Sequence, residues 1–209
     1  MSEPATRRYR GASAEQRQHE RRAKLLEAGL KVYGDIGYHA ATVRGICHEA
    51  GLTERYFYES FANSEDLLCA VYEQVIANQR ERMVAAIAAA VPDHAAMIRA
   101  GLTAFLAFVQ ESPASARVQF LEVLGVSPRV DQLYRRAIET FAQLLRGLSE
   151  GNSTLSRNVD MDTLSVGLVG AMVGIGSRWM LSGFAQPLED VVTTSHIIFS
   201  GVMEQLQRA

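Results

Sequence analysis

The residues with the most distinctive chemistry lie in the nine-residue stretch 53–61, which reads T-E-R-Y-F-Y-E-S-F. Four of the nine are aromatic, although aromatic residues make up only 8% of the chain. On a helix with Thr53 as its N-cap, Phe57 and Phe61 share one face at i and i+4, where they can anchor the helix to a core. An arginine and two tyrosines then lie outside that face, where they can contact a partner.

Side chains capable of catalysis or metal binding are scattered through the rest of the chain. The five histidines show no spacing with cysteines or carboxylates that suits a metal ion, and we expect them at the surface or at helix caps: His19, His39, His48, His94 and His196. Cys47 and His48 are sequence neighbours, so a helix turns them about 100° apart and makes them a poor nucleophile–base pair. The sequence therefore predicts no catalytic residue, no metal site and no cofactor.

Composition and charge limit the class of protein. With 209 residues, 48% of them hydrophobic and 21% charged, the chain can form a substantial core, and wholesale disorder is not expected. The net charge of −2 conceals an asymmetry, because residues 1–63 carry +2 and residues 64–209 carry −4. The first 24 residues contain three acidic and seven basic side chains: Arg7, Arg8, Arg10, Arg17, Arg21, Arg22 and Lys24. Such a basic arm suits a phosphate-bearing partner, although a solvated tail has the same composition.

The cysteines and apolar runs indicate the compartment. Cys47 and Cys69 lack a C-x-x-C spacing, and we expect both to be packing residues in a reducing compartment. The chain does not open with a charged segment followed by an apolar one, so no secretion signal is expected. The longest uncharged apolar run, Val166–Gly176, is too short and too rich in glycine to span a bilayer. These features predict a cytoplasmic protein with no membrane partner.

The elements that position these residues are helices. Helical periodicity dominates and strand-like alternation is absent, so we predict an all-α protein of about nine helices, with glycines and prolines between them. The expected spans are Glu15–Ile36, Val43–Glu49, a helix from Thr53 to about Phe61, Glu65 to about Val91, Asp93–Glu111, Ala114–Leu124, Arg129–Glu150, Met161–Ser182 and Leu188–Gln207. Asn63 or Ser64 is the expected cap of the fourth.

Two of the predicted helices are short and are separated by a tight turn. Thr42 caps the first, Gly51 ends it where a left-handed residue is needed, and only Leu52 separates that glycine from the Thr53 cap. Two short helices joined in this way form a helix-turn-helix, whose second helix enters the major groove of DNA. Many helical proteins contain a glycine between two helices, so the motif alone is only moderately specific.

The residues around the motif make it more specific. Over about Ala23–Tyr72 the chain resembles the N-terminal domain of the TetR family of transcriptional regulators, through the segments Gly37-Tyr38, Thr42–Ile46, Ala50–Thr53, Phe57-Tyr58 and Phe61–Leu67. The rest is similar to the family in being helical, of the right length and closed by two strong C-terminal helices. The resemblance implies a basic arm and a three-helix helix-turn-helix domain over residues 1–66. It also implies a helical ligand-binding and dimerisation domain over residues 67–209.

The resemblance also implies which residues meet DNA. Thr42 and Arg44 should contact the backbone or an adjacent base. The other contacts should come from the second helix of the motif and its flanks: Thr53, Arg55, Tyr56, Tyr58, Glu59, Ser60 and Ser64. The family commonly has a basic or aromatic residue at position 59, a histidine at position 60 and a phosphate-binding lysine at position 64. This chain departs from the family at all three, which weakens the expected backbone contacts.

The chemistry of these side chains fits the assignment. Arg55 can donate two hydrogen bonds to guanine N7 and O6, which is worth about 1 to 3 kcal/mol of discrimination. Tyr58 can place its hydroxyl on a phosphate, and Tyr56 can press its ring on a thymine methyl. Glu59 can accept from cytosine N4 or simply hold Arg55 at i, i+4. Alternatively, the tyrosines only pack against neighbouring helices and Arg55 is solvated.

The helix over Ser165–Ser182 carries small residues at i+3 and i+4 spacing. Each glycine lowers intrinsic helicity by up to about 1 kcal/mol, a cost that close approach of another helix offsets. By the resemblance, the last two helices of each chain pair in a four-helix dimer interface: Gly170, Gly174, Ser177, Val191, Ser195, Ile198, Val202 and Leu206. A hairpin packed within one chain is the alternative. A dimer would read two half-sites about 34 to 36 Å apart.

Apolar side chains of the middle helices are either ordinary core or, as the resemblance suggests, the lining of an effector pocket: Met97, Phe105, Phe108, Phe120, Leu124, Tyr134, Phe141, Met172, Arg178 and Trp179. We therefore predict a ligand-responsive regulator rather than an enzyme. It would bind a palindromic operator in double-stranded DNA as a homodimer, act as a repressor and be released by a small, largely apolar effector. The alternative function is a helical adaptor that binds a protein partner and no specific DNA.

Overall fold

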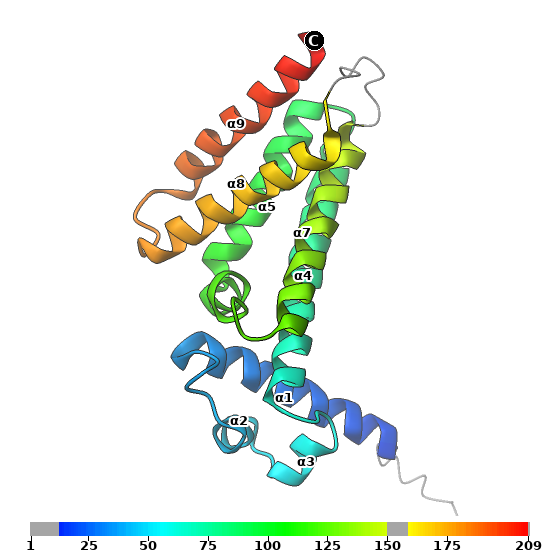
Figure 1. Ribbon diagram of the computed structural model, residues 1–209, viewed down its shortest axis with the longest axis vertical. Helices are drawn as coiled ribbons and strands as arrows, with labels where there is room; N and C mark the ends of the chain where they lie inside the picture. The colour runs from blue at the N-terminus through cyan, green and yellow to red at the C-terminus, as the bar shows by residue number, and fades with distance from the viewer. Residues whose placement is uncertain (1–12, 150–158, 209) are drawn as a thin grey trace, which may run out of the picture.

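The computed structural model describes residues 13–149 and 159–208, and this part of the chain is helical, as predicted. The N-terminal domain contains α1 (Ala14–Ile36), α2 (Val43–Ala50) and α3 (Glu54–Tyr58). The body contains α4 (Ser64–Ala89), α5 (His94–Glu111), α6 (Pro113–Arg117), the π-helical turn η1 (Val118–Glu122), α7 (Pro128–Ser149), α8 (Met161–Leu181) and α9 (Leu188–Arg208). In Figure 1 the molecule is elongated, with α1–α3 at one end and α4 running from there into the bundle.

Of the two short helices, α2 begins and ends where the sequence predicts to within one residue, whereas α3 stops at Tyr58, before the predicted end at Phe61. The Thr42 side chain accepts a hydrogen bond from a backbone amide of α2 at 3.0 Å, and Gly51 ends that helix with a left-handed φ of 64°. Asn63, and not Ser64, caps α4, because its side chain accepts from a backbone amide at 2.8 Å. Thr53 stands at the N-cap position of α3, but its side chain makes no capping hydrogen bond.

The segment predicted as a single helix over Ala114–Leu124 differs from that prediction. It begins at Pro113 as α6 and widens after Arg117 into the π-helical turn η1. In a π-helical turn each hydrogen bond spans one more residue than in an α-helix. Such turns are rare and are frequently found at functional sites. Periodicity could not reveal it, because the widening depends on packing around the turn. One consequence is that a polar side chain, Gln119, is only 4% exposed.

Two hydrophobic clusters hold the molecule together. The first fills the N-terminal domain, where Leu25, Tyr33, Ile46 and Phe57 are completely buried, and it continues onto the lower part of the body. The second fills the upper body between α4, α5, α7, α8 and α9. The predicted domain boundary at residue 66 falls in the first turn of α4, so one continuous helix takes part in both regions.

Polar contacts also fix the N-terminal domain to the body. The Glu122 carboxylate in η1 accepts a hydrogen bond from the backbone amide of Tyr38 at 2.6 Å, and it pairs with Arg117 at 2.8 Å. Arg117 also donates to the carbonyl of Gly34 at 3.4 Å. A second contact lies at the start of α4, where Arg129 of α7 pairs with Asp66. The body therefore holds the C-terminal end of α1 and the loop that follows it.

The turn between α8 and α9 is fixed by one aromatic side chain. The indole N–H of Trp179 donates to the carbonyl of Gln186 at 2.9 Å, and the ring of Phe184 packs edge-on at 5.0 Å. Phe184 adopts a left-handed φ of 59°, which is uncommon for a bulky residue. Figure 1 shows α8 and α9 meeting at this turn and separating toward their other ends.

Candidate DNA-binding interface and effector cavity

The short helix α3 presents the side chains that the sequence singles out. Phe57 is completely buried, Phe61 is 5% exposed, and their ring centroids lie 5.8 Å apart, so these two rings anchor the helix. On the outer side, the Arg55 side chain is 84% exposed and Tyr58 is 57% exposed. The two residues are therefore free to meet a partner at this end of the molecule, where a basic and an aromatic side chain suit DNA.

Tyr56 and Glu59 have contacts within the protein. The Arg21 guanidinium of α1 lies 4.4 Å from the centroid of the Tyr56 ring, and Arg21 also lies 3.6 Å from the Glu59 carboxylate. Glu59 accepts a hydrogen bond from Arg55 at 3.1 Å, which is the i, i+4 contact predicted as one of its two roles. Tyr56 is half-buried against α1, so the alternative that it packs on a neighbouring helix describes its position here. Glu59 is balanced by two arginines, which reduces its repulsion of phosphates.

The other predicted DNA-binding residues divide into two groups. Thr42, Arg44 and Thr53 are exposed. Ser60 and Ser64 are half-buried, and their backbone carbonyls accept hydrogen bonds from Arg22 at 3.4 Å and from the Tyr33 hydroxyl at 3.3 Å. The second group therefore supports the position of α3 and the start of α4 through backbone contacts.

Arg21 and Arg22 have a role that the sequence analysis missed. They were counted as part of a basic arm, yet they lie in α1, with guanidinium groups 4.4 Å from the ring centroids of Tyr56 and Phe61. Cation–π contacts of this kind hold the recognition helix against α1. The feature of the sequence that could have indicated this role is the presence of two adjacent arginines in the helix before an aromatic-rich segment. Three further basic residues of the predicted arm, Arg7, Arg8 and Arg10, fall outside the described residues.

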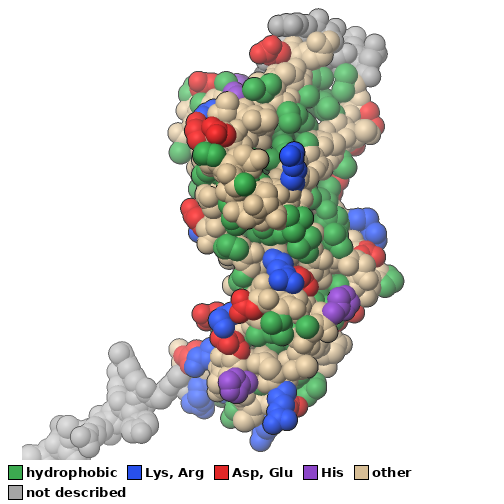
Figure 2. All heavy atoms as spheres, turned by 90° about the vertical axis from the view of Figure 1, so that its left-hand side faces the viewer, with side chains coloured by type: hydrophobic (Ala, Val, Ile, Leu, Met, Phe, Trp, Pro, Cys, Tyr) green, Lys and Arg blue, Asp and Glu red, His purple; other side chains and the backbone are tan. Residues whose placement is uncertain are grey.

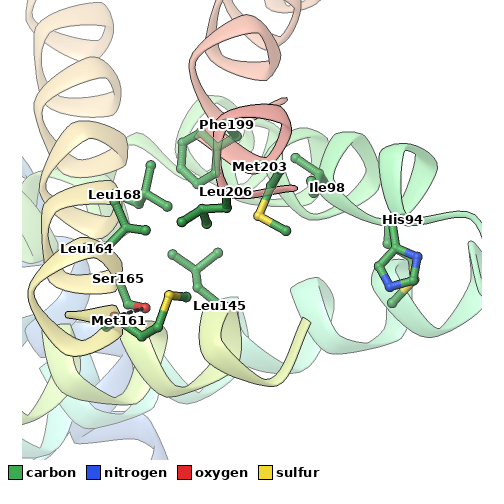
Figure 3. A pocket seen from close by; sticks show the side chains of 11 residues that line it. His94, Ile98, Leu145, Met161, Leu164, Ser165, Leu168, Phe199, Met203 and Leu206 are labelled. Atoms are coloured by element: carbon green, nitrogen blue, oxygen red, sulfur yellow. Dashed lines mark hydrogen bonds between the residues drawn. The ribbon is translucent and has the colours of Figure 1, made fainter. Parts of the chain in front are cut away.

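Three small cavities lie inside the body. The first has a volume of about 30 Å³ and is lined by residues of α5, α7, α8 and α9: His94, Met97, Ile98, Leu145, Met161, Leu164, Ser165, Leu168, Phe199, Met203 and Leu206. In Figure 3 the side chains of Leu145, Leu164 and Leu206 lie close to one another, whereas His94 stands apart at the edge. The second, of about 20 Å³, shares Met97, Ile98, Leu145 and Phe199 with the first. The third, also about 20 Å³, shares Phe141 and Met172 with the second and reaches Gln119 and Phe120 of η1. The cavities therefore follow one another from the distal end of the bundle to η1.

Most of the predicted pocket residues line these cavities: Met97, Phe105, Phe120, Tyr134, Phe141 and Met172. The others lie elsewhere. Phe108 belongs to the lower cluster, under the guanidinium of Arg82 at 5.3 Å, and Leu124 is 52% exposed. Arg178 and Trp179 line an open groove between α8 and α9. Helical periodicity predicts which positions are buried, but it does not distinguish positions that border a cavity from positions in the solid core. For this reason the sequence did not separate these four residues from those that line the cavities.

The outer face of α8 and α9 is unusually apolar. Gly167, Gly170 and Gly174 are exposed, and a Cβ atom added at any of them would meet nothing within 4 Å. Val166 and Ile198 are 41% and 42% exposed. Figure 2, which views the molecule from the left-hand side of Figure 1, shows hydrophobic side chains gathered over the body and charged ones around the N-terminal domain. The small-residue stripe thus does not pack against α9 of the same chain.

Six of the eight predicted dimer residues lie on or beside this face, and two do not. Gly170, Gly174, Ser177, Val191, Ile198 and Val202 are exposed or half-buried. Ser195 is 2% exposed and donates to the carbonyl of Val191 at 2.7 Å. Leu206 is 5% exposed and lines the first cavity. Both side chains point into the helical bundle of their own chain. The predicted stripe lies along the boundary between the outer and inner faces of α9, so some of its residues are exposed and others are buried.

The composition of α8 also bears on the membrane. A window of this helix has a mean hydropathy of 1.4, so α8 is long and apolar enough to cross a membrane on those two criteria, which the shorter run Val166–Gly176 does not meet. Core helices of soluble proteins satisfy the same criteria. Here one side of α8 is buried in the bundle through Val169, Met172 and Trp179. We attribute its apolar character to that packing and to the face described above.

Side chains that commonly bind metal ions do not cluster in the described part of the chain. Within residues 13–149 and 159–208, no group of three His, Cys, Asp or Glu side chains is placed to hold a metal ion. Cys47 and Cys69 are free and buried, and burial raises the pKa of both thiols. A thiol kept protonated is a poor nucleophile, which agrees with a packing role.

Comparisons with known proteins identify the N-terminal domain. Residues 25–71 match the family model of bacterial regulatory proteins of the tetR family. The chain is 27% identical over 161 residues to the HTH-type transcriptional activator FasR of Mycolicibacterium smegmatis, covering 77% of this chain and 73% of that protein. It is 33% identical over 117 residues to the HTH-type transcriptional regulator BetI of Rhizobium meliloti, covering 50% of this chain and 58% of BetI.

Solved structures share the whole architecture. The fatty acid degradation regulator FadR from Bacillus halodurans has a TM-score of 0.75 at 17% identity, over 84% of this chain and 92% of that one. The transcriptional regulator FadR from Bacillus subtilis, solved in complex with stearoyl-CoA, has a TM-score of 0.75 at 17% identity, over 83% and 95%. At such identity the likeness concerns the fold.

The helix-turn-helix geometry, the family match over residues 25–71 and the shared fold agree with one another. The two curated relatives are also transcriptional regulators. The chain is therefore a DNA-binding transcriptional regulator and not an enzyme, and it belongs to the TetR family of bacterial regulatory proteins.

Proposed function

We propose that the protein is a dimeric regulator that binds a palindromic operator as a repressor and is released by a small, largely apolar effector. The observation that carries this proposal is the line of apolar cavities from the distal end of the bundle to η1. At η1, Glu122 holds the loop after α1, so a ligand in the cavities would act next to the contact between the two domains.

The DNA-binding unit in this proposal is residues 1–66, and the effector-binding and dimerisation unit is residues 67–209. Arg55 and Tyr58 are the principal contacts to DNA, because their exposed side chains on α3 can donate hydrogen bonds to bases and phosphates. Thr42, Arg44 and Thr53 contact the backbone from beside them. Tyr56, Glu59, Ser60 and Ser64 act chiefly by holding α3 and the start of α4. A protein that reads chromosomal DNA in a bacterium works in the cytoplasm.

The dimer interface in this proposal is the outer face of α8 and α9. Exposed glycines allow a second helix to approach closely, and a groove of about 530 Å³ between the two helices offers apolar side chains to a partner. A second copy of the chain fits, because a two-fold interface is self-complementary. Replacing Gly174 by Trp should convert the dimer to a monomer in sedimentation experiments and weaken operator binding, whereas Gly147→Trp on α7 is the control. A monomeric wild-type protein at micromolar concentration would contradict the interface.

The effector is expected to be apolar and elongated. The cavities are lined almost entirely by hydrophobic side chains and follow one another along the bundle. The FadR structure with stearoyl-CoA shows that this fold can hold a long acyl chain in another protein. Each cavity here has room for only about one or two water-sized groups. Binding must therefore separate helices, and a ligand that prefers the separated state shifts the population toward it.

An activator is the second candidate, and the similarity to FasR, which is named an activator, favours it. A reporter gene placed behind the operator distinguishes the two, because repression is relieved and activation is lost when the protein is deleted. The adaptor alternative differs in a separate respect: it does not predict binding to duplex DNA.

The experiment that tests the proposal is selection of bound sequences from random DNA duplexes, followed by fluorescence anisotropy on the selected sequence. We expect two inverted half-sites and affinity that falls steeply with salt, because phosphate contacts release counterions. A scrambled duplex is the matched control. Enrichment of no sequence, or affinity independent of salt, would contradict a DNA-binding repressor and favour the adaptor.

A further inference from the structure

A pair of buried amides lies at the third cavity, which Gln119 lines and to which Gln79 is joined through its hydrogen bond with Gln119. The Gln119 side chain of η1 hydrogen-bonds to Gln79 of α4 with 2.8 Å between Nε2 and Oε1. Gln79 is completely buried and Gln119 is 4% exposed. The other two polar atoms of the pair, Nε2 of Gln79 and Oε1 of Gln119, are buried without a hydrogen-bond partner. Exchanging the oxygen and nitrogen of both amides leaves the same result, one free donor group and one free acceptor.

Such a pair is costly unless it is completed. A buried polar group without a hydrogen bond costs roughly 1 to 3 kcal/mol, so two of them at one place are unusual in a native core. Leucine or methionine at both positions would fill the space without that cost. The amides therefore point to a polar group that binds between or beside them.

The surroundings restrict the charge of that group. The cavity that Gln119 lines is otherwise built from aromatic and aliphatic residues, with Tyr72 and Tyr134 as the other polar side chains. Burial raises the pKa of both tyrosines, so both phenols stay neutral. None of the described residues that line the cavity carries a charge, and an unpaired carboxylate or ammonium would be strongly disfavoured there.

We propose that Gln79 and Gln119 form the polar recognition site of the effector cavity. They select an apolar chain that carries an uncharged group with both a hydrogen-bond donor and an acceptor, such as an alcohol or a primary amide. This inference rests on the proposed effector-binding function and assigns the chemical class of the effector.

The position of Gln119 also gives the site a route to DNA binding. Gln119 and Glu122 belong to the same π-helical turn, and Glu122 accepts the hydrogen bond from the Tyr38 amide in the N-terminal domain. A ligand that hydrogen-bonds Gln119 therefore acts on the turn that holds the domain. A ligand that fills only the distal cavity near His94 does not touch this turn.

Calorimetric titration with three probes of matched length tests the proposal: 1-decanol, 1-methoxynonane and decanoate. The alcohol donates and accepts, the ether only accepts, and the carboxylate is charged. We expect the wild-type protein to bind 1-decanol about tenfold more tightly than the ether, and decanoate more weakly still. The double variant Gln79→Met/Gln119→Met should bind the alcohol and the ether equally.

Two controls keep the result interpretable. The double variant should remain folded with an unchanged or higher melting temperature, because replacing both partners by apolar groups of similar shape is close to neutral. Gln143→Met, at an exposed position of α7, should keep the wild-type preference. Equal binding of alcohol and ether to the wild type, a preference that survives in the double variant, or no binding of any probe would overturn the proposal. Operator binding, measured separately, decides whether the proposed regulatory function stands in those cases.

Discussion

The N-terminal domain and the body are both helical, yet they are packed differently. In the domain, the side chains that position α3 are completely buried, as Phe57 and Ile46 show, and cation–π contacts with Arg21 and Arg22 hold the helix from outside. In the body, the core surrounds three cavities and a pair of incompletely bonded amides. A fully packed region moves as a unit, whereas a region with internal space has more than one way to pack.

The contrast assigns different tasks to the two regions. Recognition of a base sequence needs side chains held in fixed positions, which the domain provides. A response to a ligand needs two packings of similar free energy, which spare volume in the body provides. Four sets of substitutions test this contrast.

Phe57→Ala should show how completely the domain is packed. It removes a completely buried ring from the domain core, and we expect a loss of about 3 to 5 kcal/mol in the free energy of unfolding, with loss of operator binding. Phe141→Ala, in the body, should cost less because the helices around the cavities can close in. Chemical denaturation at one fixed protein concentration measures both. Equal costs would show that the body is as tightly packed as the domain.

Arg55→Ala combined with Tyr58→Phe should separate binding from folding. Both side chains are exposed, so the free energy of unfolding should change by no more than about 0.5 kcal/mol. Operator affinity should fall about ten- to hundredfold, corresponding to the loss of a bidentate base contact and a phosphate contact. Fluorescence anisotropy measures the affinity. Unchanged binding to the selected duplex would remove α3 from the interface.

Two valine-to-isoleucine substitutions compare the packing of the lower cluster, which joins the domain to the body, with that of the third cavity. Val71 is 1% exposed in the lower cluster, and an added methylene there should destabilise the protein by about 1 to 3 kcal/mol. Val173 lines the third cavity, and the same change there should stabilise it by about 0.5 kcal/mol while weakening effector binding. Thermal unfolding gives the sign of each. The same sign at both positions would contradict spare volume near η1.

The smallest effect concerns the ion pair between Arg129 of α7 and Asp66 of α4. The hydrogen bond from Arg129 lowers the pKa of Asp66, so the pair stabilises the folded state above the ordinary pKa of an aspartate, and this contribution disappears as the pH falls through the lowered value. Asp66→Asn should therefore be slightly less stable than the wild type at pH 7, with the difference vanishing as the pH falls through the lowered pKa of Asp66. Both partners are partly exposed, so the difference should also shrink at high salt. A difference independent of pH would indicate loss of the Ala62 backbone contact instead.

The sequence predicted most of the fold because local chemistry marks helix ends. Thr42, Gly51 and Asn63 terminate helices as expected, and the four prolines of the described residues lie between helices or at their first residue. The recognition helix was also located correctly, because Phe57 and Phe61 share a face that only burial explains. The spacing of the α8 glycines predicted a close helix contact without saying with which helix, and in the structure these glycines face outward.

Features that depend on contacts between distant residues were not predictable. The π turn, the Gln79–Gln119 pair and the contact between Glu122 and Tyr38 each join segments at least 40 residues apart or result from such contacts. Ser195 and Leu206 are buried in the bundle rather than exposed on the predicted dimer face. An apolar stripe shows that one side of a helix is covered, but it does not show which neighbouring helix covers it. Leu124 was assigned to a pocket on its apolar character alone, and it is exposed.

The attachment of α1 to the body at one end has a geometric consequence. Glu122 and Arg117 hold the backbone near Gly34 and Tyr38, whereas the contacts to α3 come from Arg21 and Arg22, near the opposite end of the helix. With 23 residues, α1 is about 34 Å long, so a tilt of about 5° around the held end moves the other end by about 3 Å. In a two-fold assembly the second copy tilts in the opposite sense, which doubles the change in distance between the recognition helices. A tilt of this size would put the two recognition helices out of step with the turns of the double helix.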